Sequence, residues 1–330
     1  MLKSALLVLA ACLTATAATA ACDGPGLMDT LSGAERAALD AEVAATPYGT
    51  GLAWQATKGA DRISIIGTMH LHDPRHDAIV ERLDPAIRAA SLVLVEMTPD
   101  EERSMTRAMA EDPSRFFITE GPTLPDLLGD EDWADIADAA RARMMPGIMA
   151  AKTQPWFLSI TLALPECAIG DLLAGQRGLD HRIMDVATEA GLPIAPLEAW
   201  DTLPSLFAGI PFDDQLDMLR LALLEPELQE AAFTTMLDSY FSGRVAEIWA
   251  MQTLLIDRLD PEDAAAARVG LGLTEELIMT GRNHAWMPVI LGAVADHGHI
   301  VVAAGAAHMP GEEGVLRLLE AEGWEIAPLP

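Results

Sequence analysis

Basic residues are scarce in this 330-residue sequence, which has 21 lysines and arginines against 50 aspartates and glutamates. The formal charge of -29 at pH 7 argues against binding to nucleic acid or to an anionic membrane, because phosphate contacts need clustered basic side chains. Aromatic residues make up only 5% of the chain, whereas alanine and leucine are abundant, which favours helices over an all-β fold. The acidic balance indicates a solvated surface, or else a cationic partner.

Long apolar runs are missing beyond the N-terminus. Residues 1–21 combine Lys3, the apolar run Ala5 to Leu13 and a series of small residues, which is the pattern of a secretory signal peptide. No later stretch has 18 apolar residues without a charge, so we expect no membrane span in the mature chain. The sequence therefore predicts a periplasmic or secreted protein. A lipoprotein is the alternative, although neither Cys12 nor Cys22 has the full lipid-attachment pattern.

Cysteine is rare, with three in the whole sequence. Removal of the signal peptide takes away Cys12 and leaves Cys22 and Cys167. An even pair of cysteines in an exported protein predicts a disulfide bond. Two buried thiols are the alternative.

Two common hydrolase signatures are absent from the sequence. There is no Gly-x-Ser-x-Gly motif, which argues against a serine hydrolase of the α/β-hydrolase type. There is no His-Glu-x-x-His helix, so the chain differs from the zincin proteases. A low-complexity linker is missing as well, and residues 22–330 are therefore expected to form a single domain.

Two segments at opposite ends of the chain share one pattern. Residues 63–73 and 300–311 each contain a β-type apolar run, a glycine, and a histidine three positions later. Such runs suit strands buried on both faces of a parallel sheet, where ligands bind beyond the carboxyl ends of the strands. His70 and His308 are therefore predicted to converge on one site.

The Gly-x-x-His pattern itself occurs four times, at Gly67, Gly178, Gly281 and Gly305. Composition alone predicts roughly 0.6 occurrences. Only the first and last copies follow a strand-like run, whereas the middle two lie where helical patterns begin or end. The sequence context therefore favours the first and last copies as site loops.

The remaining periodicity predicts an α/β fold with a central, mostly parallel sheet built from the N- and C-terminal segments, and a large helical region inserted at about 98–296. Ser32 and Glu35 form a capping box for one helix, and Asp73 is expected to be the N-cap of another that starts at Pro74. Helices are expected at 31–45, 74–90, 133–144, 147–164, 181–190 and 311–322, and strands at 52–57, 62–67, 91–97, 193–198, 299–304 and 324–329.

Glu96 ends a predicted buried strand and would reach the same sheet edge as the two histidines. Two imidazoles and a carboxylate form a common ligand set for a hydrolytic metal ion with an open position. Such an ion lowers the pKa of bound water towards about 7. Glu96 is either the third ligand or a general base. Arg282 could stabilise an oxyanion and Asn283 could donate a hydrogen bond to it.

Four further residues are candidates for supporting this site. Asp180 could hold Arg282 in place, and Glu198 is a second carboxylate at the end of a predicted strand. His72 either lines the site or has a surface or capping role. His284 either lies near the site or is a helix-surface residue.

These motifs, in this order, resemble the TraB/GumN (Tiki-like) family over about residues 51–324. The matching pieces are Gly67-Thr68-Met69-His70, Glu96, Gly178-Leu179-Asp180, Leu197-Glu198, Arg282-Asn283 and the segment from Gly305-Ala306-Ala307-His308 to Leu316. The resemblance implies an α/β core with two Gly-x-x-His loops and a site glutamate. The chain departs from the family pattern in one respect. Family members often have a glutamine shortly after the Leu-Glu pair, and this chain has none there.

Relatives of Tiki are metal-dependent proteases, so the resemblance implies an exported metal-dependent hydrolase, with a peptidase as one form of it. The cofactor expected is a divalent metal ion such as Mn, Co or Zn, and the substrate a peptide or a small molecule. More distant relatives include erythromycin-esterase-type hydrolases and haem-binding ChaN-like lipoproteins. A haem- or metal-binding protein is therefore an alternative. Another is a non-catalytic factor that sequesters a peptide signal. The sequence leaves the oligomeric state open.

Overall fold

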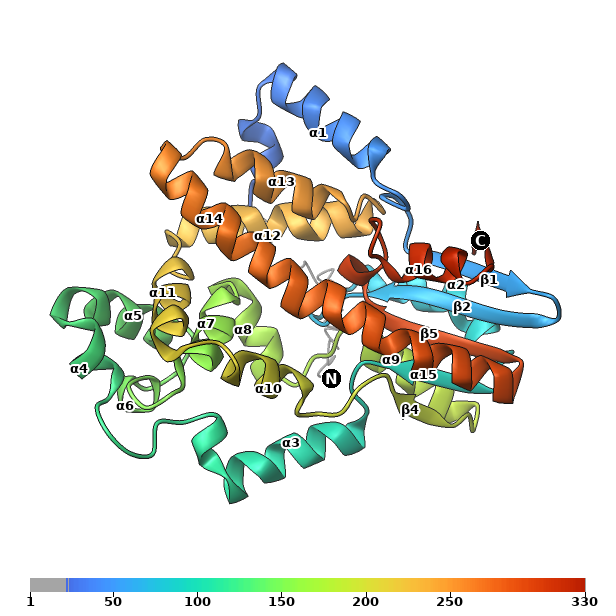
Figure 1. Cartoon of the computed structure of the whole chain (residues 1–330), viewed down its shortest axis with the longest axis horizontal. Coiled ribbons are helices and arrows are strands. Elements are labelled where there is room, and N and C mark those ends of the chain that lie inside the picture. Colours follow the sequence, from blue (N-terminus) through green and yellow to red (C-terminus); the bar gives the residue numbers. More distant parts are fainter. Residues whose placement is uncertain (1–21, 23, 330) are drawn as a thin grey trace, which may run out of the picture.

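A six-stranded sheet forms the centre of the computed structural model, which describes residue 22 and residues 24–329 (Figure 1). The predicted signal peptide, residues 1–21, lies outside the described residues. The strand order is β4-β3-β5-β2-β1-β6. The strands are β1 (Ala53–Lys58), β2 (Asp61–Thr68), β3 (Leu92–Val95), β4 (Ile194–Pro196), β5 (His299–Gly305) and β6 (Glu325–Pro328).

Four neighbouring strands are parallel, since β2 pairs with β5, β5 with β3, and β3 with β4 in that sense. β1 is antiparallel to both β2 and β6. The prediction of an α/β fold with a mostly parallel sheet and a large helical region is confirmed. The carboxyl ends of the parallel strands face the helical region (Figure 1).

Sixteen α-helices surround and extend the sheet within the described residues. A π-helical turn at Glu275–Thr280 joins α14 to α15, and the two form a continuous rod from the helical region to the sheet (Figure 1). The helices are α1 (Gly33–Ala45), α2 (His76–Arg88), α3 (Pro99–Glu111), α4 (Leu124–Leu128), α5 (Asp130–Ala142), α6 (Gly147–Ala150), α7 (Pro155–Ala163), α8 (Glu166–Leu173), α9 (Leu179–Glu189), α10 (Thr202–Ala208), α11 (Phe212–Leu221), α12 (Pro226–Phe241), α13 (Glu247–Ile256), α14 (Pro261–Thr274), α15 (Gly281–His297) and α16 (Val315–Ala321).

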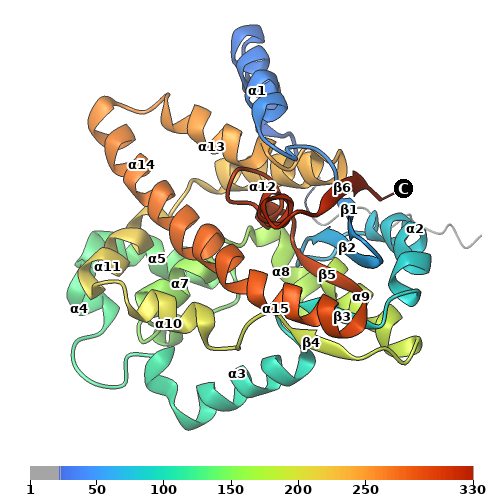
Figure 2. The same cartoon turned by 45° about the vertical axis from the view of Figure 1, so that its right-hand side comes forward.

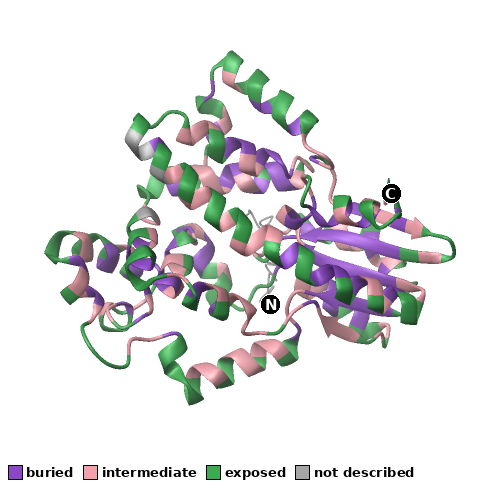
Figure 3. Cartoon of the chain, in the orientation of Figure 1, coloured by how far each residue is buried: buried purple, intermediate pink, exposed green. Residues whose placement is uncertain are grey.

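Helices cover both faces of the sheet (Figure 2), which explains why its central strands β3 and β5 are almost wholly apolar. In β3, Val93 and Val95 pack with α2 and α9, whereas Leu92 and Leu94 pack with α15 and α16. The middle strands are buried, while the outer surfaces of the helices remain exposed (Figure 3). This packing holds the loops after β2, β3 and β5 in fixed positions.

Several predicted helices have other bounds in the structure; α16, for example, begins at Val315 rather than at Gly311. The segment 147–164 is not one helix, because α6 ends at Ala150 and a new helix, α7, begins at Pro155, whose ring cannot donate a backbone hydrogen bond. α2 begins at His76 rather than at Pro74. Asp73 is therefore not its N-cap; its carboxylate accepts hydrogen bonds from the backbone and the guanidinium of Arg75 instead.

The sulfur atoms of Cys22 and Cys167 lie 1.98 Å apart, at disulfide-bonding distance. The pairing ties the segment before α1 to α8, as predicted from the cysteine count. Within the described part of the chain, no single helix is long and apolar enough to cross a membrane. The consecutive helices α7 and α8 pass the same test together by length and composition, but they are bent by 97°.

Candidate functional site

The loops after β2 and β5 bring His70 and His308 to the same place. The strands pair in parallel with Thr68 opposite Gly305, so the residues that follow each strand leave the sheet side by side. A β-carbon added at Gly305 would lie 3.7 Å from His70 Nε2, 3.5 Å from His308 Cδ2 and 3.2 Å from Glu96 Oε1. The two imidazoles and the carboxylate therefore surround one point above Gly305.

His70 lies between two carboxylates. Its Nε2 is 3.8 Å from Glu96 Oε1, and its Nδ1 is 3.5 Å from Asp180 Oδ2. Burial disfavours the charged ring, but the bond to Asp180 and the negative charges of both carboxylates raise the pKa of His70 to about 9. The side chain keeps 60% of its accessible surface, so water weakens each of these effects.

His308 is 2% exposed and has a different environment. Its Nδ1 is 2.6 Å from Asn283 Oδ1, and its ring packs 4.4 Å from that of Trp286. Because the Asn283 amide nitrogen donates to the Glu313 carbonyl, its oxygen faces the ring, and this network assigns the proton to Nδ1. Burial and the charge of Arg282 lower the pKa of His308 to about 4 despite the opposing effect of Glu96.

Glu96 follows β3 directly and is bonded through both of its oxygens. The Gly305 backbone N–H donates to Oε1 at 2.6 Å, and Arg282 Nη2 donates to Oε2 at 2.6 Å. Burial favours the neutral acid, but the positive charges around Glu96 and the Gly305 bond lower its pKa to about 2. Glu96 is therefore a carboxylate at neutral pH.

Arg282, at the start of α15, joins Glu96 to Glu198. Its Nε and Nη2 bind the Glu198 carboxylate, which also accepts a bond of 2.9 Å from the Trp286 indole. Its Nη1 is 3.2 Å from the Ile278 carbonyl and 3.3 Å from His308 Nε2. With the bond to Glu96, these contacts engage all five guanidinium N–H groups. Direct roles of Arg282 and Asn283 on a substrate stay predictions, since both side chains have protein partners.

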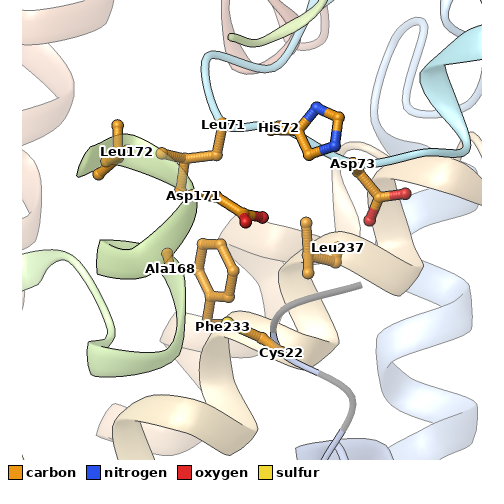
Figure 4. A pocket seen from close by; sticks show the side chains of 9 residues that line it. All are labelled: Cys22, Leu71, His72, Asp73, Ala168, Asp171, Leu172, Phe233 and Leu237. Carbon is orange, nitrogen blue, oxygen red and sulfur yellow. The ribbon is translucent and has the colours of Figure 1, made fainter. Parts of the chain in front are cut away.

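The predicted supporting residues have other neighbours than the sequence suggested. Asp180 contacts His70 and His181, while Glu198 rather than Asp180 holds Arg282. His284 is exposed and binds Glu313 at 2.6 Å. His72 faces a separate pocket of about 10 Å³ beside Cys22, lined also by residues of α8 and α12 (Figure 4).

The sequence analysis missed Trp286, and it named Gly178 without expecting its contact with the His70 loop. Trp286 lies four residues after Arg282, so both side chains are on the same side of α15, and that spacing was the available signal. Gly178 packs directly against the loop of His70. A β-carbon there would lie 2.2 Å from the Met69 carbonyl oxygen and 2.3 Å from the His70 carbonyl carbon.

Replacing Gly178 with alanine is expected to lower the free energy of unfolding by about 1–3 kcal/mol, because the clash is with backbone and cannot be relieved by a side-chain rotation. Urea denaturation measures the change. Gly147→Ala is the control, since a β-carbon there meets nothing within 4 Å. Equal stability of the two variants would show that the His70 loop does not pack on Gly178.

The donor set suits a divalent metal ion by its chemistry. Both imidazoles have an oxygen acceptor beside Nδ1, Asp180 for His70 and Asn283 for His308, which directs both Nε2 atoms to the same side as Glu96. Oxygen partners on the far nitrogen are typical of metal-binding histidines. Across the described residues, however, no three side chains of histidine, cysteine, aspartate or glutamate lie close enough together in this conformation to hold a metal ion. Binding would require His308 Nε2 to leave its contact with Arg282.

Fold and site define an α/β protein with two histidine loops and a buried glutamate at the carboxyl ends of its parallel strands. A sequence profile of the TraB/PrgY/gumN family matches residues 52–328, and the chain belongs to this family. The resemblance found in the motifs is thereby confirmed. No curated protein and no solved structure matches the chain.

Proposed function

We propose that this protein is a metal-dependent hydrolase that cleaves an amide or ester bond in a peptide or small molecule. The observation that supports it best is the shared orientation of His70 and His308. Each ring has an oxygen acceptor at Nδ1, and each lies beside the same ionised Glu96. This arrangement offers two imidazole nitrogens and one carboxylate to a divalent cation such as Mn, Co or Zn. His308 is neutral, whereas His70, whose pKa is raised to about 9, would release a proton when it binds the ion.

His70, His308 and Glu96 would hold the ion. When bound, it supplies a Lewis acid and lowers the pKa of a water molecule towards about 7. Asp180 and Asn283 act as positioning residues, since each fixes the tautomer and orientation of one imidazole. Arg282 balances the charges of Glu96 and Glu198 and keeps both carboxylates in place.

We also propose that the protein works outside the cytoplasm. The proximity of Cys22 and Cys167 supports this, because disulfides persist in oxidising compartments. The N-terminal segment that resembles a signal peptide supports it independently.

Metal analysis of the purified mature chain tests the proposed function. We expect about one divalent ion per chain, and we expect hydrolysis of a peptide library, followed by mass spectrometry, to stop on chelation and to resume when the ion is restored. Chelation removes the metal ion from the side chains that hold it and does not change the protein chain. A protein that carries no ion and cleaves equally well with and without chelator would contradict the proposal. A visible absorption band would indicate bound haem instead.

A further inference from the structure

A second pocket, of about 260 Å³, lies next to the residues that hold His308. Its walls are α1, α13, the π-helical turn before α15, and the loop 307–314 that carries His308. The Asn283 side chain is shared, because it lines this pocket and accepts the hydrogen bond of His308 Nδ1. The pocket and the candidate site therefore share one side chain and one loop.

The lining of this pocket is acidic. Four glutamates contribute to it, namely Glu42, Glu275, Glu312 and Glu313, and none of the lining residues is a lysine, arginine or histidine. Glu312 binds Arg317 and Glu313 binds His284. Among the described side chains, no hydrogen bond or ion pair engages the carboxylates of Glu42 or Glu275. A cation that enters the pocket would therefore meet two carboxylates that have no competing partner.

Much of the remaining lining is apolar, and it includes an aromatic ring. Trp249 from α13 and Met279 from the π-helical turn line the pocket together with three alanines and Pro310. An indole attracts a cation to its face, and a methionine side chain adapts to an aliphatic chain. Since both kinds of surface occur together, the pocket suits a positive charge on an aliphatic stem better than an inorganic ion.

The backbone around the pocket is unusual at the position where the pocket meets the site. The π-helical turn Glu275–Thr280 supplies three lining residues and leads directly into Arg282 and Asn283. Single π-helical turns inside α-helices are frequent at functional sites. Here the turn places Glu275 and Met279 on the pocket wall.

We propose that this pocket binds an organic cation, an ammonium or guanidinium group on an aliphatic stem, of the kind that a lysine or arginine side chain carries. Its link to Asn283 makes it a specificity pocket beside the hydrolytic centre, and this last step rests on the proposed function. Binding of the cation does not rest on it, because the glutamates and the tryptophan that line the pocket are not among the residues proposed to hold the metal ion.

Fluorescence anisotropy with a dye-labelled hexapeptide, Gly-Gly-Lys-Gly-Gly-Gly, tests the proposal at 0.15 M salt, where long-range attraction to the acidic surface is screened. The same peptide with norleucine keeps the stem and lacks the charge. We expect the lysine peptide to bind about tenfold more tightly than the norleucine peptide. The cation could belong to a peptide side chain or to a free polyamine. Spermidine distinguishes the two, since it displaces the peptide only if the pocket also accepts free polyamines.

The double variant Glu42→Gln, Glu275→Gln is expected to weaken binding of the lysine peptide about tenfold. Its control is Glu111→Gln, Glu120→Gln, which removes the same charge from exposed positions away from the pocket and leaves binding unchanged. The proposal would be overturned if the two double variants bound the lysine peptide equally well. It would also be overturned if the unaltered protein bound the lysine and norleucine peptides equally well. His70→Ala should bind the peptide normally, so a failure of the proposed hydrolysis is distinguishable from a failure of this pocket.

Discussion

Replacing His70 or His308 with alanine is expected to lower the rate of hydrolysis by about 10³-fold. Each substitution removes one of the two nitrogen donors that face Glu96, and two remaining donors hold a divalent ion poorly. The metal content of each variant should fall together with its rate. The measurement is the initial rate on the best peptide from the library, with metal content determined on the same samples.

His284→Ala is the control for both variants, because His284 is exposed and binds Glu313 at the surface. It should keep its metal and its rate. His308→Ala also leaves a cavity beside Trp286, so its folding must be checked by circular dichroism. His70 is largely exposed, and its variant should fold normally. A folded His70→Ala protein with undiminished rate would contradict the assignment.

Replacing Arg282 with alanine is expected to lower the free energy of unfolding by about 3 kcal/mol. Arg282 is 5% exposed and neutralises Glu96 and Glu198, whose side chains are 14% and 13% exposed. Removal of one partner of a buried ion pair leaves an uncompensated buried charge, which is far more costly than the loss of a surface pair. Urea denaturation at neutral pH measures the change.

Arg88→Ala is a matched control, since Arg88 also joins two carboxylates, Asp84 and Glu189, but at the surface. Its variant should lose less than about 1 kcal/mol. Adding Glu198→Gln to Arg282→Ala should recover about 1 kcal/mol or more, because one orphaned charge is removed. Similar losses for the two arginine variants would show that the buried pair does not stabilise the fold.

The sheet could be predicted from the sequence because its strands are buried on both faces. Continuous apolar runs such as 92–95 and 300–304 have few alternatives in a chain of this composition. Helix boundaries were less predictable, because local side-chain bonds decide them. Asp73 binds Arg75 rather than capping α2, and Pro155 starts a helix within a segment whose periodicity reads as continuous.

The site was most predictable where it follows strands, although Arg282 and Asn283, at the start of α15, were also expected there. His70 and His308 come three positions after Gly67 and Gly305, at the ends of β2 and β5, and Glu96 follows β3 directly. The two middle Gly-x-x-His copies also belong to the site, but through residues inside the motif. The copy at Gly178 supplies Asp180, and the copy at Gly281 supplies Arg282 and Asn283.

The sequence did not show which side chains from distant segments bind each other. Glu198 and Arg282 are 84 residues apart, and Glu96 and Arg282 are 186 apart. The local sequence around Arg282, at the start of α15, does not indicate which carboxylate its guanidinium binds. That choice depends on strand order, which places β3, β4 and β5 side by side. Sequence reasoning therefore gave Arg282 the wrong partner, Asp180.

A crystal structure of the protein grown with Mn²⁺, with anomalous diffraction recorded at the manganese edge, would show whether His70, His308 and Glu96 hold a metal ion together. We expect one strong peak bonded to the Nε2 atoms of His70 and His308 and to the Glu96 carboxylate, with Asp180 and Asn283 still beside the two Nδ1 atoms. A structure in which His70 and His308 turn away from each other, or in which manganese binds only elsewhere, would contradict this expectation.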